Sequence, residues 1–123
     1  MELRVELFVA DLDVFVDFYT RVLGFEIVDD RRHAEQPYVA VRRGRARIGA
    51  VRRWAPVDRS ARGLPTGTEL VLETDDVTAE RDRVIAAGWS LDEDLTERPW
   101  GLTDFRLYDP DGYYLRMTAK PPS

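Results

Sequence analysis

The spacing of hydrophobic residues predicts a strand, a helix and three further strands in the first half of the chain. Residues 5–9 (VELFV) alternate in the manner of a strand, and Asp11 then supplies a helix cap. Helical spacing follows, and Gly24 marks its end. One face of this helix carries Leu12, Phe15, Val16, Tyr19, Val22 and Leu23. Three strand-like segments come next, at residues 25–29, 38–44 and 45–53.

The second half repeats this pattern. Residues 70–74 (LVLET) predict a strand, Asp76 a helix cap, and Gly88 the helix end. The apolar positions of this helix are Val77, Val84, Ile85 and Ala87. Strands are predicted at residues 89–95, 103–109 and 113–117. The chain is therefore expected to be α+β, one domain over 1–123 with two β-α-β-β-β units at 1–52 and 67–120. The Pro-, Gly- and Arg-rich stretch 53–66 is the predicted linker.

The last predicted hairpin carries one residue that a hairpin does not explain. Asp109-Pro-Asp-Gly112 supplies turn chemistry between two alternating segments. Trp100 precedes these strands, between Pro99 and Gly101. Two explanations stay open for Trp100: packing at a dimer interface, or stacking on a planar ligand.

Composition narrows the class of protein. With 44% hydrophobic and 33% charged residues, the chain is expected to be a soluble folded protein. It shows no apolar run of membrane-spanning length and no signal peptide, so a cytoplasmic location and no membrane partner are expected. The absence of cysteine excludes disulfides and thiolate ligands. A net charge of −5 disfavours nucleic-acid binding, and the arginine-rich stretch 41–53 is interpreted as a solvated hairpin paired with nearby acids.

The paired units, the FYTRVLGFE helix end (18–26) and DPDG at 109–112 together resemble the vicinal oxygen chelate superfamily. Its members include glyoxalases, extradiol dioxygenases, and fosfomycin- and bleomycin-resistance proteins. PWG at 99–101, followed by a strand and DPDG, looks most like the bleomycin-resistance branch. The resemblance implies a glyoxalase/bleomycin-resistance-type fold and a homodimer. It also implies that the Trp belongs to a ligand-binding cleft at the dimer interface.

In metal-dependent members of that superfamily, His, Glu or Gln side chains from the first and last strands of each unit bind the ion. Counting from the capping Asp and from DPDG places Arg4, Gly49, Glu69 and Arg116 at the corresponding positions. Arginine stays protonated and donates no lone pair, so only Glu69 is a usable ligand. His33, the one histidine, lies in a predicted loop away from these strands. We therefore expect no metal and no other cofactor.

Strand alternation predicts which other side chains share the face of the family's site. Arg4, Glu6 and Phe8 are expected there in the first unit, and Glu69 in the second. Asp104, Arg106, Tyr114 and Arg116 are expected to join them from the last two strands, with Trp54 and Trp100 from the loops. Two interpretations stay open: Arg116 or Arg4 forms an ion pair with Glu69 where other members hold a metal, or these groups bind the polar parts of a ligand.

The expected function is small-molecule binding, for example sequestration of a bleomycin-like antibiotic, without metal catalysis. An acidic protein with aromatic cleft walls suits a cationic ligand with a planar ring. The alternative is a metal-dependent lyase or dioxygenase of the glyoxalase type. Whether the protein is an enzyme stays open at this point, with a non-catalytic role favoured because no nucleophile set or phosphate loop is present.

Overall fold

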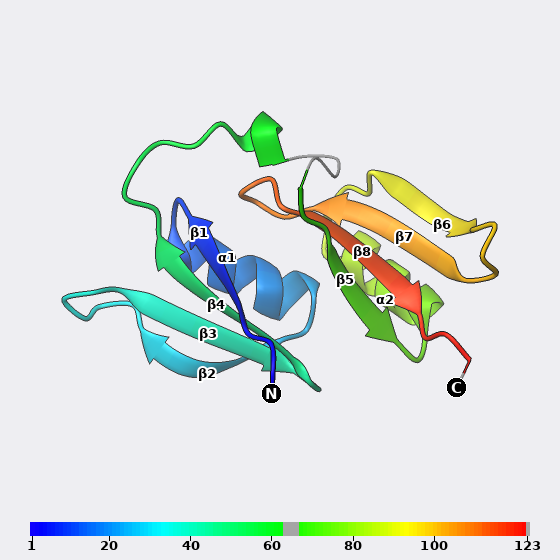
Figure 1. Cartoon of the computed structure of the whole chain (residues 1–123), viewed down its shortest axis with the longest axis horizontal. Helices are drawn as coiled ribbons and strands as arrows, with labels where there is room; N and C mark the ends of the chain where they lie inside the picture. Colours follow the sequence, from blue (N-terminus) through cyan, green and yellow to red (C-terminus); the bar gives the residue numbers. More distant parts are fainter. Residues whose placement is uncertain (63–66, 123) are drawn as a thin grey trace. The chain divides into compact units, whose positions relative to one another are not determined.

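The computed structural model describes residues 1–62 and 67–122. The chain forms two compact units, Met1–Pro56 and Val57–Ser123. Each unit contains a four-stranded mixed sheet with one α-helix on one face (Figure 1). This is the α+β fold expected from the sequence.

The first unit begins with β1 (Val5–Val9), which pairs in parallel with β4 (Ala46–Arg52). Helix α1 (Leu12–Asp17) and a π-helical turn (Phe18–Val22) follow β1. Strands β2 (Glu26–Arg31) and β3 (Tyr38–Arg43) complete the antiparallel part of the sheet, in the order β1-β4-β3-β2. The core lies between α1 and the sheet, where Leu7, Val9, Val39, Val41, Ile48 and Ala50 are buried against the helix side chains.

The helix of the first unit buries one residue more than the sequence analysis placed on its apolar face. The sequence places Leu12, Phe15 and Tyr19 in the core, and they are buried, but Phe18 is buried as well. Phe18 follows Phe15 by three residues and precedes Val22 by four, so regular helical spacing already places it on the buried face. The rings of Phe18 and Tyr19 meet edge to face at 5.0 Å. The helix then ends at Gly24 with φ of 76°, as the sequence predicted.

The second unit repeats this order. Strand β5 (Leu70–Thr74) pairs in parallel with β8 (Tyr114–Ala119), and α2 (Val77–Ala86) follows β5. Strands β6 (Glu93–Glu97) and β7 (Thr103–Tyr108) give the sheet order β5-β8-β7-β6. The prediction of a strand at 89–95 is wrong in its position. Trp89 instead donates its indole N–H to the carbonyl of Tyr108 at 2.8 Å, and the ladder with β7 begins only at Glu93.

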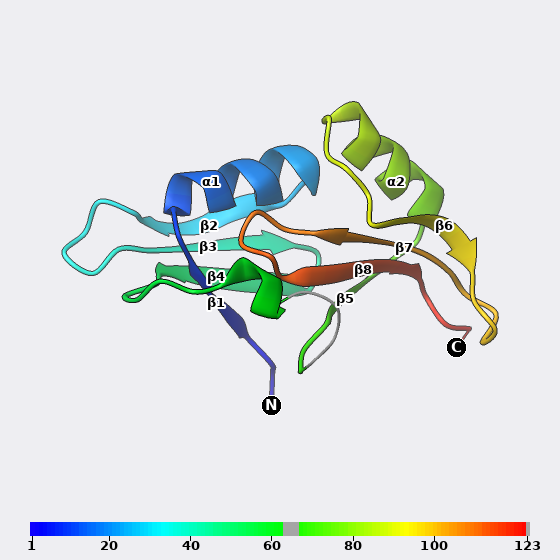
Figure 2. The ribbon, with the colours of Figure 1, turned by 90° about the horizontal axis from the view of Figure 1, so that it is seen from above.

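Helix α2 is buried less than its apolar residues suggested. Val84 is fully buried, but Ile85 is exposed, and Glu80 is buried instead. Seen from above in Figure 2, each helix lies on one face of its own sheet. We call the opposite face of each sheet its helix-free face. None of the helices in the described part of the chain is long and apolar enough to span a membrane.

Candidate functional site

Three residues form a chain of contacts on the helix-free face of the second unit: Glu69, Arg116 and Trp100. Arg116 lies within β8, and its Nη2 forms an ion pair with Oε1 of Glu69 at 3.0 Å. Its guanidinium also lies 5.9 Å from the centre of the Trp100 ring, within range of a cation–π interaction. The side chains of Glu69 and Arg116 are 18% and 23% exposed, whereas Trp100 is 56% exposed. A large indole therefore lies open to solvent beside a shielded ion pair.

A second group of charges surrounds Asp104 on the same face. The Asp104 side chain is fully buried in β7, and its Oδ1 accepts a hydrogen bond from Nε of Arg98 at 3.0 Å. Arg98 also donates through Nη2 to Glu93 at 2.6 Å. Nε of Arg106 lies 3.4 Å from the same Glu93 oxygen. Any ligand on this face would thus meet Arg98 and Arg106 before it reached Asp104.

Tyr114 is part of the framework of this face. It is buried in β8 and donates its hydroxyl to Oδ2 of Asp92 at 2.8 Å. Its ring lies 5.0 Å from that of Tyr108, the residue opposite it in β7. Burial, and then the hydrogen bond to Asp92, raise the pKa of the Tyr114 hydroxyl. The hydroxyl therefore stays protonated and acts here as a hydrogen-bond donor.

The first unit has its own cluster of polar side chains, centred on Glu6. Arg4 Nε lies 2.9 Å from Glu6 Oε1, and the Tyr38 hydroxyl donates to the same oxygen at 3.1 Å. Burial and the hydrogen bond to Glu6 raise the pKa of Tyr38. Gly49, the neighbour of Glu6 across β1 and β4, leaves the space that the Glu6 carboxylate and the Tyr38 hydroxyl occupy. The partner of Arg4 is thus Glu6.

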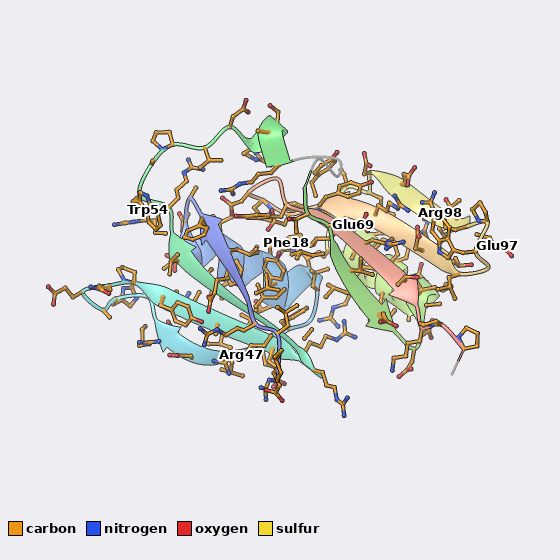
Figure 3. The ribbon with its side chains drawn as sticks, viewed as in Figure 1. Phe18, Arg47, Trp54, Glu69, Glu97 and Arg98 are labelled. Atoms are coloured by element: carbon orange, nitrogen blue, oxygen red, sulfur yellow. The ribbon has the colours of Figure 1, made fainter. Side chains whose placement is uncertain are left out.

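Two aromatic residues of the first unit also lie open to solvent. Phe8 lies on β1, on the same face as Glu6, and its ring meets that of Trp54 edge to face at 5.2 Å. Trp54 is 84% exposed and lies just beyond the end of β4 (Figure 3). Together the two rings form an exposed apolar patch, and contiguous exposed apolar patches are the kind of surface that a ligand or a partner covers.

The residues at the family's ligand positions do not fit a metal ion. Arg4 and Arg116 carry positive charge, Gly49 has no side chain, and Glu69 is already paired with Arg116. Within residues 1–62 and 67–122, no group of three His, Asp or Glu side chains is arranged to hold a metal. His33 instead lines a pocket of about 250 Å³ at the start of α1 with Asp11, Asp13 and Arg32. Arg32 forms ion pairs with Asp13, which also lines this pocket, and with Asp30 outside it.

The structure gathers the predicted site residues into two clusters, one in each unit. Arg4, Phe8 and Trp54 belong to the first unit, and the others belong to the second: Glu69, Trp100, Asp104, Arg106, Tyr114 and Arg116. Sequence reasoning missed several partners that hold them in place, namely Tyr38, Asp92, Glu93 and Arg98. Glu6 was recognised as sharing the face, because it alternates with Arg4 and Phe8, but not as the centre of a cluster. Arg98 could not be recognised in this way, because it lies in the turn after β6, where the strand pattern of alternating side chains ends.

The comparisons with known proteins agree with this architecture. Residues 3–117 match the model of the Glyoxalase/Bleomycin resistance protein/Dioxygenase superfamily. No curated protein sequence shows significant similarity to the chain. Among solved structures, TioX from Micromonospora sp. ML1 is 26% identical, with a TM-score of 0.79 over 97% of this chain and 98% of that one.

Two further structures share the fold. A protein of unknown function from Agrobacterium tumefaciens str. C58 is 25% identical, with a TM-score of 0.76 over 98% of this chain and 95% of that one. The bleomycin resistance determinant encoded on transposon Tn5 is 21% identical, with a TM-score of 0.79 over 99% of both chains. Because the family model covers nearly the whole chain, the protein belongs to the Glyoxalase/Bleomycin resistance protein/Dioxygenase superfamily.

Proposed function

We propose that the protein binds a small planar molecule on its helix-free faces and does so without a metal ion. One observation carries this proposal: the exposed Trp100 ring lies beside an ion pair, Glu69–Arg116, at positions where metal-dependent relatives carry ligands. An ion pair cannot supply the three or more lone-pair donors that a divalent ion needs. An exposed indole offers a flat apolar surface of the kind that ligand clefts use.

Charge supports a cationic ring for the second unit. From Val57 onward, acidic residues outnumber basic ones by 14 to 8. On its helix-free face Glu69, Glu73, Glu93 and Asp104 accompany Arg106 and Arg116. Sequestration of a bleomycin-like compound, rather than catalysis, is the form of binding that we favour. This proposal draws on family membership and on the shared fold with the Tn5 bleomycin resistance determinant.

The proposal includes a homodimer, in which a second copy would cover aromatic residues that one chain leaves exposed, such as Phe8 and Trp54. Sedimentation at micromolar concentration tests this part, and a stable monomer would contradict it. A cytoplasmic location, a single domain formed by both units and the absence of nucleic-acid partners belong to the same proposal. The rival function is a metal-dependent lyase or dioxygenase. About one tightly bound transition metal per chain in elemental analysis would favour that rival.

Titration with a bleomycin-like compound tests the site directly. If Trp100 forms the wall of the site, Trp100→Ala should weaken binding by roughly 1–3 kcal/mol and leave the melting temperature nearly unchanged. Trp89→Phe is the matched control, because the Trp89 indole donates a hydrogen bond to the Tyr108 carbonyl and so has a structural role. Equal affinities in wild type and Trp100→Ala, or a Trp100→Ala variant that unfolds or dissociates, would leave Trp100 a structural residue.

A further inference from the structure

The turn between β6 and β7 gives Trp100 a defined backbone. The Gly101 amide donates to the Arg98 carbonyl, and the Arg98 amide donates to the Leu102 carbonyl, each at 2.9 Å. Gly101 has a φ of 91°, so Pro99, Trp100 and Gly101 form a three-residue hairpin loop that ends in a left-handed glycine. These backbone bonds fix the shape of the turn. They do not fix where the turn lies relative to the helix-free face of the second unit.

Neither its strand nor the Trp100 ring anchors this turn. Strand β6 lies at the edge of its sheet, and its ladder with β7 is interrupted between Glu93 and Thr96. Trp100 is 56% exposed, so it is not held by burial. Its ring lies 5.9 Å from the Arg116 guanidinium, and a cation–π contact within reach of solvent contributes little to stability. A third contact is needed to explain why Trp100 lies beside Arg116.

The side chain of Arg98 provides that contact. Arg98 is the first residue of the turn, and its side chain is only 15% exposed. Its Nε and Nη2 lie 3.0 and 2.9 Å from Oδ1 of Asp104 in β7, and Nη2 also donates to Oε2 of Glu93 in β6 at 2.6 Å. Figure 3 labels Arg98 next to Glu97, the last residue of β6. One guanidinium thus ties the turn to both of the strands that it joins.

Asp104 makes this anchor strong. Its side chain is fully buried, and its Oδ2 has no hydrogen-bond partner. Nε of Arg106 lies 3.5 Å from Oδ1 and has no hydrogen-bond partner either. Among the described residues, Arg98 is therefore the hydrogen-bond donor to this carboxylate. A buried carboxylate without a donor is costly, so the folded protein keeps Arg98, and with it the turn, in this position.

We propose that Arg98 is a positioning residue of the ligand site. It holds the turn so that the Trp100 ring lies beside Arg116, open to a planar ligand, and it acts through Trp100 rather than by attraction. A guanidinium does not attract the cationic ring proposed above, since like charges repel. The role rests on the proposed function in one respect, that the ligand stacks on Trp100. Its structural part, the link between Arg98 and Trp100, is open to measurement without ligand.

Replacing Arg98 and Asp104 together removes the anchor, leaves no buried charge unpaired and keeps the net charge unchanged. The variant is Arg98→Met with Asp104→Leu, because well-packed apolar residues of similar size replace buried ion pairs at little cost. Arg81→Gln with Asp94→Asn is the matched control. It removes an arginine–aspartate pair between α2 and the same strand β6, at a place that does not reach the turn.

Fluorine NMR of protein labelled with 5-fluorotryptophan tests the structural part. The chain has 3 tryptophans, each of which gives one signal, and Trp100→Phe identifies the signal of Trp100. In Arg98→Met/Asp104→Leu we expect this signal to narrow and to move toward the shift of the free amino acid, because the turn is released. The Trp89 signal should stay in place, since its indole is bonded to Tyr108 within the fold. The control pair should leave the Trp100 signal unchanged.

Calorimetric titration with bleomycin tests the effect on binding. Release of Trp100 in the double variant should weaken binding about fivefold or more, the lower end of what loss of an aromatic anchor does. The control pair should leave the affinity within about twofold of wild type, because distant sites act independently. Arg98→Gln alone is the second variant. It removes a positive charge, which by electrostatics alone would tighten the binding of a cation, so weaker binding has the sign of lost positioning.

Each outcome has a definite meaning. An unchanged Trp100 signal in Arg98→Met/Asp104→Leu would overturn the proposal, whatever the result with bleomycin. A shifted signal with wild-type affinity would overturn it as well, since Arg98 would then hold a turn that the ligand does not use. If the double variant did not fold, Arg98→Gln would decide: weaker binding with the Trp89 signal in place supports positioning, and equal or tighter binding overturns it. If wild type bound no bleomycin, the proposed sequestration would fail, and the Trp100 signal alone would show whether Arg98 holds the turn.

Discussion

The carboxylate of Glu6 lies directly against the backbone of Gly49 in the adjacent strand. A Cβ at position 49 would overlap Glu6 Oε2 and the Tyr38 hydroxyl, and would lie 2.9 Å from Glu6 Cδ. This position is where the resemblance to metal-dependent relatives places a ligand. Glycine at this position has two consequences. It supplies no side-chain ligand for a metal ion, and it leaves the space in which the Glu6 carboxylate accepts a hydrogen bond from the Tyr38 hydroxyl.

Gly49→Ala should break the Glu6–Tyr38 hydrogen bond at little cost in stability. The overlapping atoms are the ends of two flexible side chains, which can move away, so we expect a loss below about 1 kcal/mol. The pKa of Tyr38, now raised by burial and by Glu6, should fall toward its ordinary value. Absorbance titration of the tyrosines measures this, with Tyr38→Phe identifying the relevant step. An unchanged Tyr38 pKa in Gly49→Ala would contradict the arrangement.

Gly112→Ala should be far more damaging, because the neighbour there is backbone. Gly112 has a φ of 88°, and a Cβ would lie 2.7 Å from the carbonyl oxygen of Arg59 in the 3₁₀ turn Arg59–Arg62. Gly88→Ala is a close control, since Gly88 has a φ of 80° but nothing within 4 Å of its Cβ position.

Both variants should lose about 1–2 kcal/mol to the left-handed backbone conformation. Gly112→Ala should lose roughly 1–3 kcal/mol more, because the Arg59 segment must move. Urea denaturation of the two variants gives the difference. Equal losses would show that the 3₁₀ turn does not pack on the DPDG hairpin in solution.

These contacts mark the limit of what the sequence predicts. Periodicity, caps and stop glycines yielded the order of elements in both units, because each depends on residues close in sequence. The position of β6 was missed because Trp89 bonds to Tyr108 in a distant strand. Burial of Phe18 could have been predicted, because Phe18 lies three residues after Phe15 and four before Val22 on the same helical face. The partners of the site residues, such as Arg98 for Asp104, depend on how turns fold back, which hydrophobic alternation does not encode.

The ion pair between Arg81 on α2 and Asp94 on β6 predicts a loss of stability in acid. Arg81 donates to both Asp94 oxygens, at 2.8 and 2.7 Å, and these bonds lower the pKa of Asp94 to about 2. A carboxyl whose pKa is lower in the folded state stabilises the protein above its ordinary pKa near 3.8. That stabilisation is lost as the pH falls through about 2.

Melting curves between pH 4 and pH 2 test this prediction. Asp94→Asn and Arg81→Gln should each lose less stability than wild type over this range, and by similar amounts. Both variants retain Asp30, whose pKa is also lowered to about 2 by Arg32. Part of the loss of stability in acid should therefore remain in both variants. If both variants lost as much stability as wild type between pH 4 and pH 2, the Arg81–Asp94 ion pair would not form in solution.

Glu69 should control Trp100 through Arg116. Glu69→Gln removes the charge that holds Arg116, whose side chain is 23% exposed, and leaves the guanidinium without its carboxylate partner. We expect a loss of about 1 kcal/mol, a small value because the pair is partly reached by solvent. Freed from Glu69, the guanidinium should shift relative to the indole at 5.9 Å, and the fluorescence of Trp100 should change.

The Trp100 signal is obtained as the difference from Trp100→Phe in each background. Glu73→Gln is the control, since Glu73 lies in β5, which begins just after Glu69, and on the same face, but is exposed. Adding Arg116→Gln to Glu69→Gln should recover stability without restoring the wild-type Trp100 signal. If Glu69→Gln and Glu73→Gln gave the same spectra, Arg116 would not position Trp100.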